Sequence, residues 1–134
     1  KVEDLEPLTA TMLGVGFNIT PVNDPPAVTT NSGASFDNGS TGNVVGQAVL
    51  ETSDPDNPAA ELTYTVTALP VNGTLFKSGT PLGVNDTFTQ ADINGGSITY
   101  DHDGSATNSD SFDFDVADSE PLSVTGQTFS VTIP

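Results

Sequence analysis

Two short stretches, LTYTV at residues 62–66 and FDFDV at residues 112–116, indicate the fold class. In each of them apolar and polar residues alternate with a period of two, which is the pattern of a β-strand with one face turned toward a core. A strand of this kind places every second side chain on the same face of its sheet. The alternation therefore predicts six inward-facing core residues: Leu62, Tyr64, Val66, Phe112, Phe114 and Val116.

The strand-like runs in the rest of the chain are each bounded by Gly, Asn, Asp or Pro, which is typical of all-β proteins. The chain has 134 residues, with 13 Gly and 10 Pro, and this length is sufficient to bury a core without disulfides or a metal. One folded all-β domain is therefore expected. We expect strands near residues 27–29, 44–50, 62–68, 73–76, 86–88, 97–100, 111–116 and 125–133.

The two ends of the chain resemble each other. DLEPLT at residues 4–9 is similar to DSEPLS at residues 118–123, with Glu6 and Glu120 114 positions apart, and each is followed by a strand-like run that ends in proline. We interpret residues 1–21 as the last loop and strand of a preceding repeat, and residues 22–134 as one complete repeat. The prolines of VNDPP at residues 22–26 then stiffen the linker between the two.

The charge balance excludes several classes of partner. Asp and Glu number 18 against 2 Lys and Arg, which gives a formal net charge of -16 at pH 7. Nucleic acids and anionic membranes are repelled by such a chain, whereas divalent cations, calcium foremost, would neutralise its crowded carboxylates. The absence of cysteine excludes disulfides and thiolate zinc sites. No apolar run approaches the ~20 residues of a membrane span, so no membrane insertion is expected.

Several motifs occur in an order that resembles one known family. They are LTY at 62–64, LPVNGTL at 69–75, FTQADI at 88–93, ITYDHDG at 98–104 and DSF at 110–112. Together they resemble the chondroitin sulfate proteoglycan type, cadherin-like repeat, over nearly all of residues 22–134. The VNDPP linker is similar to that of many bacterial giant-adhesin repeats, so a large bacterial surface adhesin is the expected source.

The resemblance implies an immunoglobulin-like Greek-key β-sandwich of about seven strands, used in tandem outside the cell, either at the cell surface or secreted. Adjacent repeats of the same chain are the implied partners. Polysaccharide of the cell surface or matrix, or a like repeat on another cell, are alternative partners. The leading function is then a calcium-stiffened adhesion module, and the alternatives are a carbohydrate-binding module and a homophilic adhesion module.

Calcium takes six to eight oxygen ligands, so acidic loops that converge at one end of a sandwich are the pattern to seek. The DPD at residues 54–56 resembles the Asp-x-Asp of cadherin repeats, and VADSEP at 116–121 resembles the aspartate loop after their penultimate strand. The alternative is that these aspartates only accept hydrogen bonds from backbone amides in a proline turn. In a sandwich of this topology the VNDPP linker and both of these loops reach the N-terminal end. The candidate calcium ligands are therefore Asn23, Asp24, Asp54, Asp56 and Asp118.

A second acidic group lies in DHDGSATNSD at residues 101–110 and is expected at the opposite end, facing the next repeat. The segment is not an EF-hand, because Phe112 stands where position 12 of that loop requires Glu. The secondary candidates for a weak calcium site are Asp101, Asp103 and Asp110, with Asn108 beside them.

No catalytic centre is expected. His102 is the only histidine, so neither a His-based zinc site nor a catalytic triad can be assembled, and we predict an exposed loop position for it. A glycosidase would bring paired carboxylates together in a cleft, whereas these acidic residues are spread over many loops. The chain is therefore expected to bind calcium without any enzymatic activity.

Three patterns leave alternatives open. Phe36 and Phe76 are the aromatic residues that could contact a sugar, although most other aromatics fall at inward strand positions. Residues 1–21 could cover a sheet edge or pair with another molecule, and burial of Phe17 and Ile19 would decide this. Four Asn-x-Ser/Thr triplets, at residues 18, 38, 72 and 85, match the glycosylation pattern, which chance also produces in an Asn-rich chain.

Overall fold

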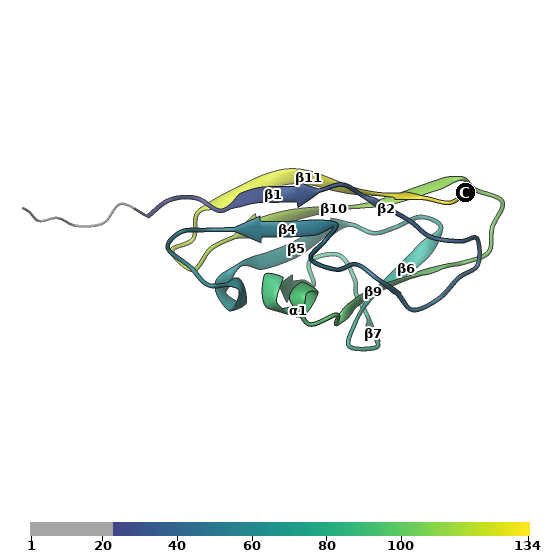
Figure 1. Ribbon diagram of the computed structural model, residues 1–134, viewed down its shortest axis with the longest axis horizontal. Helices are drawn as coiled ribbons and strands as arrows, with labels where there is room; N and C mark the ends of the chain where they lie inside the picture. Colours follow the sequence, from purple (N-terminus) through teal and green to yellow (C-terminus); the bar gives the residue numbers. More distant parts are fainter. Residues whose placement is uncertain (1–22) are drawn as a thin grey trace, which may run out of the picture.

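In the computed structural model, residues 23–134 are described, and they form three sheets of antiparallel strands with one parallel pair at an edge (Figure 1). The sheet orders are β1-β4, β2-β11-β10-β5-β8 and β3-β9-β6-β7. The predicted all-β sandwich is confirmed. The strands are β1 (Ala27–Asn31), β2 (Ala34–Ser35), β3 (Asn43–Val44), β4 (Leu50–Ser53), β5 (Thr63–Ala68), β6 (Gly73–Lys77), β7 (Thr80–Pro81), β8 (Thr87–Thr89), β9 (Ile98–His102), β10 (Ser109–Ala117) and β11 (Ser123–Thr132).

The core lies between the sheets and is built from the alternating positions of the strands. All six residues predicted to face inward have side chains that are at most 1% exposed. Tyr64 stacks on Phe88, with ring centroids 4.9 Å apart, and Phe112 packs against Phe129 at 5.3 Å. The aromatic residues of β5, β8, β10 and β11 therefore provide much of the apolar area that the fold removes from water.

One predicted strand is wrong. Residues 44–50 do not form a single strand but divide into the end of β3, a turn, and the start of β4. The amide of Leu50 donates to the Gly46 carbonyl at 3.0 Å and closes this turn. The physical reason is that Val45 and Leu50 are both buried. Positions five apart face opposite sides of an extended strand, so only a turn between them turns both side chains inward.

A short helix, α1 (Gln90–Asn94), follows β8 and was not predicted. Thr89 and Asp92 form a capping box, in which the Asp92 amide donates to the Thr89 hydroxyl and the Thr89 amide donates to the Asp92 carboxylate. The buried Gln90 side chain accepts hydrogen bonds from the Thr52 amide at 2.7 Å and from the Tyr64 hydroxyl at 2.5 Å. Helix α1 is thereby fastened to β4 and β5, and a 3₁₀ turn, η3 (Ala59–Glu61), lies beside it.

Figure 1 shows the two ends of the sandwich. The described chain enters at one end, where the loop after β4 and the connection between β10 and β11 also lie, whereas the C-terminus lies at the other. This arrangement agrees with the expected meeting of the three acidic segments at one end. Residues 1–21, with Phe17 and Ile19, lie outside the described residues, so the interpretation of that segment stays a prediction. Among residues 23–134 no helix is both long and apolar enough to cross a membrane.

Candidate metal site

Three segments far apart in the sequence are joined by hydrogen bonds at the end where the described chain begins. The Asn23 side-chain amide donates to Asp118 Oδ2 at 2.8 Å. The backbone amide of Asp24 donates to Asp56 Oδ2 at 2.7 Å. Residues 23 and 24 are therefore held against the loop after β4 and the loop after β10, and this end of the sandwich is called the linker end. Four of the five candidate ligands take part directly in these two contacts.

Each loop is also shaped by its own aspartate. Asp54 Oδ1 accepts from the Asp56 amide at 2.8 Å, and Asp118 Oδ1 accepts from the amides of Glu120 at 3.0 Å and Leu122 at 2.6 Å. Asp54 and Asp118 thus accept hydrogen bonds from loop amides, as the turn alternative requires. These contacts use Oδ1 of Asp54 and leave its second oxygen, Oδ2, free for another partner.

Three buried oxygens at this end have no hydrogen-bond donor within the described part of the chain: Asn23 Oδ1, Asp54 Oδ2 and Asn57 Oδ1. Asn57 is 8% exposed, and its amide nitrogen donates to Glu61 Oε1 and to Ser119 Oγ, both at 2.8 Å. Buried polar atoms are nearly always paired, so these three acceptors on neighbouring loops are available to a water molecule or a cation. The sequence analysis did not identify Asn57.

The carboxylates of Asp54 and Asp118 have shifted pKa values. The pKa of Asp54 is raised, first by burial and then by the neighbouring carboxylates of Asp118 and Asp56. Burial also acts to raise the pKa of Asp118, but hydrogen bonds from the Leu122 amide, the Asn23 side chain and the Glu120 amide outweigh it and lower that pKa. Ionisation of Asp54 beside Asp118 is therefore unfavourable, and a cation bound between the two carboxylates would offset that cost.

The oxygens at this end are the kind of ligand that calcium binds. Every free or negatively charged atom at this end is an oxygen, from a carboxylate or an amide, and hard cations such as calcium prefer both kinds. The residues that the structure describes contain no group of three or more His, Cys, Asp or Glu side chains placed to hold a metal. The candidate site is therefore one of two carboxylates, Asp54 and Asp118, supplemented by amide oxygens.

The secondary candidates at the opposite end do not gather around a common point. Asp101 accepts from the Gly42 amide at 2.7 Å, and Asp103 accepts from the Ser105 amide at 2.8 Å. Hydrogen bonds from the Ser105 side chain and backbone lower the pKa of Asp103. Each of these carboxylates therefore fastens a different loop.

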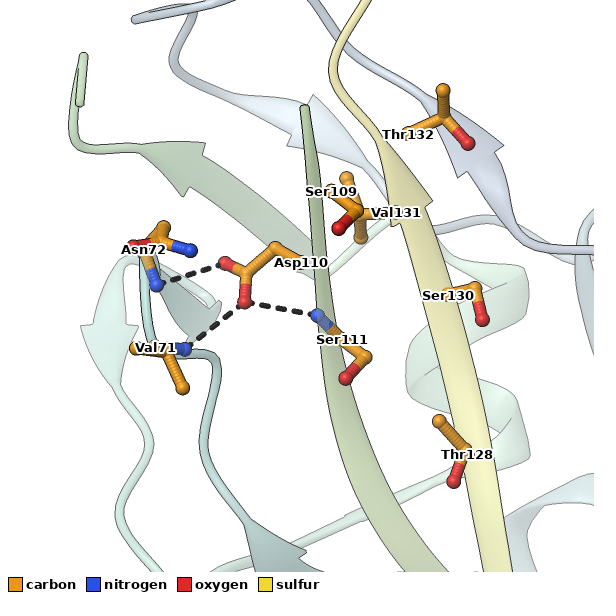
Figure 2. A pocket seen from close by; sticks show the side chains of 9 residues that line it. All are labelled: Val71, Asn72, Ser109, Asp110, Ser111, Thr128, Ser130, Val131 and Thr132. Carbon is orange, nitrogen blue, oxygen red and sulfur yellow. Dashed lines mark hydrogen bonds between the residues drawn. The ribbon is translucent and has the colours of Figure 1, made fainter. Parts of the chain in front are cut away.

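Asp110 is 9% exposed, and both of its oxygens are fully used. Oδ1 accepts from the amides of Val71 and Ser111, and Oδ2 accepts from the Asn72 amide and from the Tyr100 hydroxyl at 2.6 Å. Figure 2 shows the bonds to the three backbone amides at the rim of a pocket of about 530 Å³. Asp110 therefore holds the connection between β5 and β6 against β10. Each of its oxygens accepts two hydrogen bonds and has no lone pair left for a metal, whereas Asp118 Oδ2 accepts only the bond from Asn23.

The predicted exposure of His102 is wrong. This residue ends β9 and is 4% exposed. Its Nδ1 accepts hydrogen bonds from the amides of Gly39 at 2.9 Å and Gly104 at 3.1 Å, and Nε2 lies 3.0 Å from the Thr107 hydroxyl. The imidazole is buried because it accepts hydrogen bonds from two backbone amides, those of Gly39 and Gly104, which lie in loops outside the strand ladders.

The surface offers no aromatic platform for a sugar within residues 23–134. Phe36 is half-buried and stacks on Tyr100, with ring centroids 5.8 Å apart, and Phe76 is half-buried in β6. The other described tyrosines and phenylalanines are buried in the core. The structure therefore gives no support to sugar stacking on Phe36 or Phe76.

Comparison with known proteins identifies relatives of this repeat. The cadherin-like family model matches residues 26–133. Extracellular matrix protein 3 of Lytechinus variegatus is 45% identical over 69 residues, which are 52% of this chain and 2% of that protein. Chondroitin sulfate proteoglycan 4 of Homo sapiens is 37% identical over 121 residues, 88% of this chain and 5% of that protein.

A further human protein, FRAS1-related extracellular matrix protein 1, is 36% identical over 93 residues, which are 69% of this chain and 4% of that protein. The chain thus spans only a few per cent of the length of the relatives that it matches. No solved structure matches it. Two of these three relatives are extracellular matrix proteins by name, in agreement with the expected extracellular location. The expected bacterial source stays a prediction.

Proposed function

Because the chain belongs to the cadherin-like family, a family of adhesion-type repeats rather than enzymes, we propose that it is a structural repeat stiffened by calcium at its linker end. The extracellular, adhesion-type character of the repeat follows from its family and its matrix relatives. Calcium binding is the further step. Its support is the cluster of oxygens formed by the linker, the loop after β4 and the loop after β10.

The single observation that carries the proposal is the set of buried acceptors without donors, Asn23 Oδ1, Asp54 Oδ2 and Asn57 Oδ1, beside the carboxylate of Asp118. Leaving a buried acceptor unpaired costs about 1–3 kcal/mol, so three together on contiguous loops are an expensive arrangement unless a cation completes it. Calcium would be held by these oxygens and by Asp118. Its remaining ligands, up to the usual six to eight, would be water or oxygens of a preceding repeat.

The protein's own residues explain how such a site would stiffen an array. Asn23 belongs to the linker, and Asp54 and Asp118 belong to the body of the repeat, so one cation contacting all three fixes the linker relative to the sandwich. Pro25 and Pro26 restrict the backbone immediately after it. The linker then loses much of its freedom, and consecutive repeats are held at a defined angle.

The expected size of the effect follows from mass action. A site of extracellular affinity, with a dissociation constant of about 10⁻⁴–10⁻³ M, would stabilise the fold by about 1.4–2.7 kcal/mol at roughly 10 mM calcium. This is a modest fraction of the stability of a domain of this size. The repeat should therefore remain folded without calcium, while its linker end becomes less restrained.

The direct test is calorimetric titration with calcium after EDTA treatment, with melting temperature followed in parallel. The unmodified chain should give a binding heat and a rise in melting temperature. Asp54→Ala combined with Asp56→Ala should abolish both responses. The matched control is Asp101→Ala combined with Asp103→Ala, which removes the same charge at the opposite end and should retain them.

Two outcomes would contradict the proposal. Absence of any response to millimolar calcium in the unmodified chain would exclude calcium stiffening of this repeat. Equal loss of the response in both double variants would show that net charge, rather than the linker end, determines binding. Asp54→Asn serves as a milder variant, since it leaves Asp56 to accept from the Asp24 amide.

A further inference from the structure

Three glycosylation triplets lie in the described part of the chain, at NGS 38–40, NGT 72–74 and NDT 85–87. The sequence alone cannot rank them, because the pattern is short. The fold can rank them, since an Asn that carries an oligosaccharide must lie on the surface with its side-chain amide free and with space around it. Two of the relatives reported above are extracellular matrix proteins by name, so attachment of a glycan is chemically relevant to such surroundings.

The first two triplets are engaged by the fold. The Asn38 side-chain amide donates to the Ser105 carbonyl at 2.7 Å, and the Ser40 hydroxyl donates to the Asp37 carbonyl at 2.6 Å. Both polar groups of that triplet therefore hold the loop at the C-terminal end. A branched sugar on Asn38 would compete with these contacts.

Asn72 is half-buried and lines the pocket drawn in Figure 2, on the segment that Asp110 fastens to β10. The next residue, Gly73, packs so closely on β9 that a Cβ there would lie 2.4 Å from the Asp101 carbonyl oxygen. The chain around Asn72 therefore has no freedom to move and make room for a glycan.

Asn85 differs from both. It is exposed, and within the described part of the chain its side-chain amide has no hydrogen-bond partner. The turn is instead closed by its neighbours: the Gly83 amide donates to Asp86 Oδ2 at 2.7 Å, and the Asp86 amide donates to the Gly83 carbonyl at 3.1 Å. Asn85 has a φ of 74°, a left-handed conformation that Asn tolerates better than most residues. Thr87, the hydroxyl residue of this triplet, is also exposed.

The position of Asn85 suits a bulky substituent. Its backbone amide donates to the carbonyl of Val66, which pairs with Phe114 near the middle of β10, so the turn lies midway along the sandwich. It connects β7 and β8, each of which is the edge strand of its sheet. A glycan here would project sideways, leave both ends free for neighbouring repeats, and cover two strand edges that could otherwise pair with another chain.

We propose that Asn85 is the N-glycan acceptor of the described repeat when the chain passes through a eukaryotic secretory pathway. In the transfer, Asn85 Nδ2 attacks the anomeric carbon of a lipid-pyrophosphate-linked oligosaccharide. The C–N bond forms as the glycosidic C–O bond to pyrophosphate breaks, the lipid pyrophosphate departs, and the amide nitrogen loses one proton. Thr87 supplies the hydroxyl that the triplet requires.

The test is secretion of the chain from mammalian cells, with Asn18→Gln in every variant so that the triplet outside the described residues does not contribute. Intact mass before and after treatment with PNGase F, followed by peptide mapping, shows how many glycans are attached and where. The Asn18→Gln chain should carry one glycan, at Asn85. Thr87→Ser, which keeps the triplet, should retain it, and Thr87→Ala should lose it.

Two further variants make the result decisive. Asn85→Asp keeps a residue that accepts the left-handed turn and should be secreted without a glycan. Ser40→Ala should leave the mass of the glycan unchanged. An unglycosylated Asn18→Gln chain, a glycan mapped to Asn38 or Asn72 in place of Asn85, or a glycan that persists in Thr87→Ala would each overturn the proposal.

Discussion

The two ends of the sandwich use the same residue types in opposite ways. At the linker end, Asn23, Asp54 and Asn57 each keep a buried oxygen without a donor. At the C-terminal end, Asp110 uses both of its oxygens to accept four hydrogen bonds from the protein itself. Both ends are acidic in sequence, but among residues 23–134 only the linker end has buried side-chain oxygens without a donor.

An acidic loop is therefore not by itself a metal site. A carboxylate whose lone pairs are filled by backbone amides is a structural element that fixes a loop. A carboxylate that faces another carboxylate and keeps an oxygen without a donor is stabilised either by protonation or by a nearby cation. Replacing Asp with Asn should therefore lower the stability of the fold at the C-terminal end and the response to calcium at the linker end.

The largest effect is expected at the C-terminal end, for Asp110→Asn. The amide replaces one acceptor oxygen with a donor group in a site that three backbone amides and a hydroxyl occupy. We expect the free energy of unfolding to fall by about 3 kcal/mol. Urea denaturation in EDTA and again in calcium should give the same loss. Asp37→Asn, an exposed carboxylate at the same end, is the control and should change little.

The next effect is expected for His102→Leu. Leucine fills a volume similar to that of the imidazole but removes the nitrogen that accepts from two backbone amides. With the Gly39 and Gly104 amides left unpaired, the free energy of unfolding should fall by about 2 kcal/mol. Thermal melts would measure this. A loss that appeared only in calcium would break the contrast, because it would connect this end of the repeat to the metal.

At the linker end, Asp118→Asn should reduce the calcium-dependent part of the stability, which is about 1.4–2.7 kcal/mol at roughly 10 mM calcium. The amide can still accept from the Leu122 and Glu120 amides, so the loop should keep its shape. The rise in melting temperature on calcium addition is the measurement. A full rise in this variant would remove Asp118 from the proposed site.

The smallest effect concerns the pKa of Asp103, which hydrogen bonds from the Ser105 side chain and backbone lower. Because the folded pKa lies below the unfolded one, Asp103 stabilises the fold above the unfolded pKa, and this contribution is lost as pH falls through the folded pKa. Ser105→Ala should raise the pKa toward its ordinary value. An NMR titration of the Asp103 carboxyl carbon would detect this, and an unchanged pKa would exclude the Ser105 hydroxyl as a cause.

Much of the fold could be predicted because the alternation of apolar and polar residues along a strand shows which of its faces is buried. LTYTV and FDFDV predicted six core residues that are all buried. The start of α1 is also marked by a local pattern, because Thr89 is followed three residues later by Asp92 and the two form a capping box. The sequence analysis predicted strands only and did not include this helix. Local patterns of this kind require no knowledge of distant contacts.

The parts of the site that could not be predicted depend on partners far away in the sequence. Asn57 is buried because it donates to Ser119, 62 positions later. His102 is buried because Gly39, 63 positions earlier, donates to it. The convergence of the linker with the loops after β4 and β10 was expected from the family's topology, whereas the unpaired oxygens depend on side-chain packing that no spacing reveals.

The most direct test of the contrast between the two ends is the melting temperature of Asp54→Asn at neutral pH, in EDTA and in 10 mM calcium, a concentration of about ten to a hundred times the expected dissociation constant. Burial and the facing Asp118 carboxylate raise the pKa of Asp54, so its ionised form destabilises the metal-free repeat. We therefore predict that Asp54→Asn melts higher than the unmodified chain in EDTA and shows a smaller rise in calcium. A lower melting temperature in EDTA together with an undiminished calcium response would contradict this account.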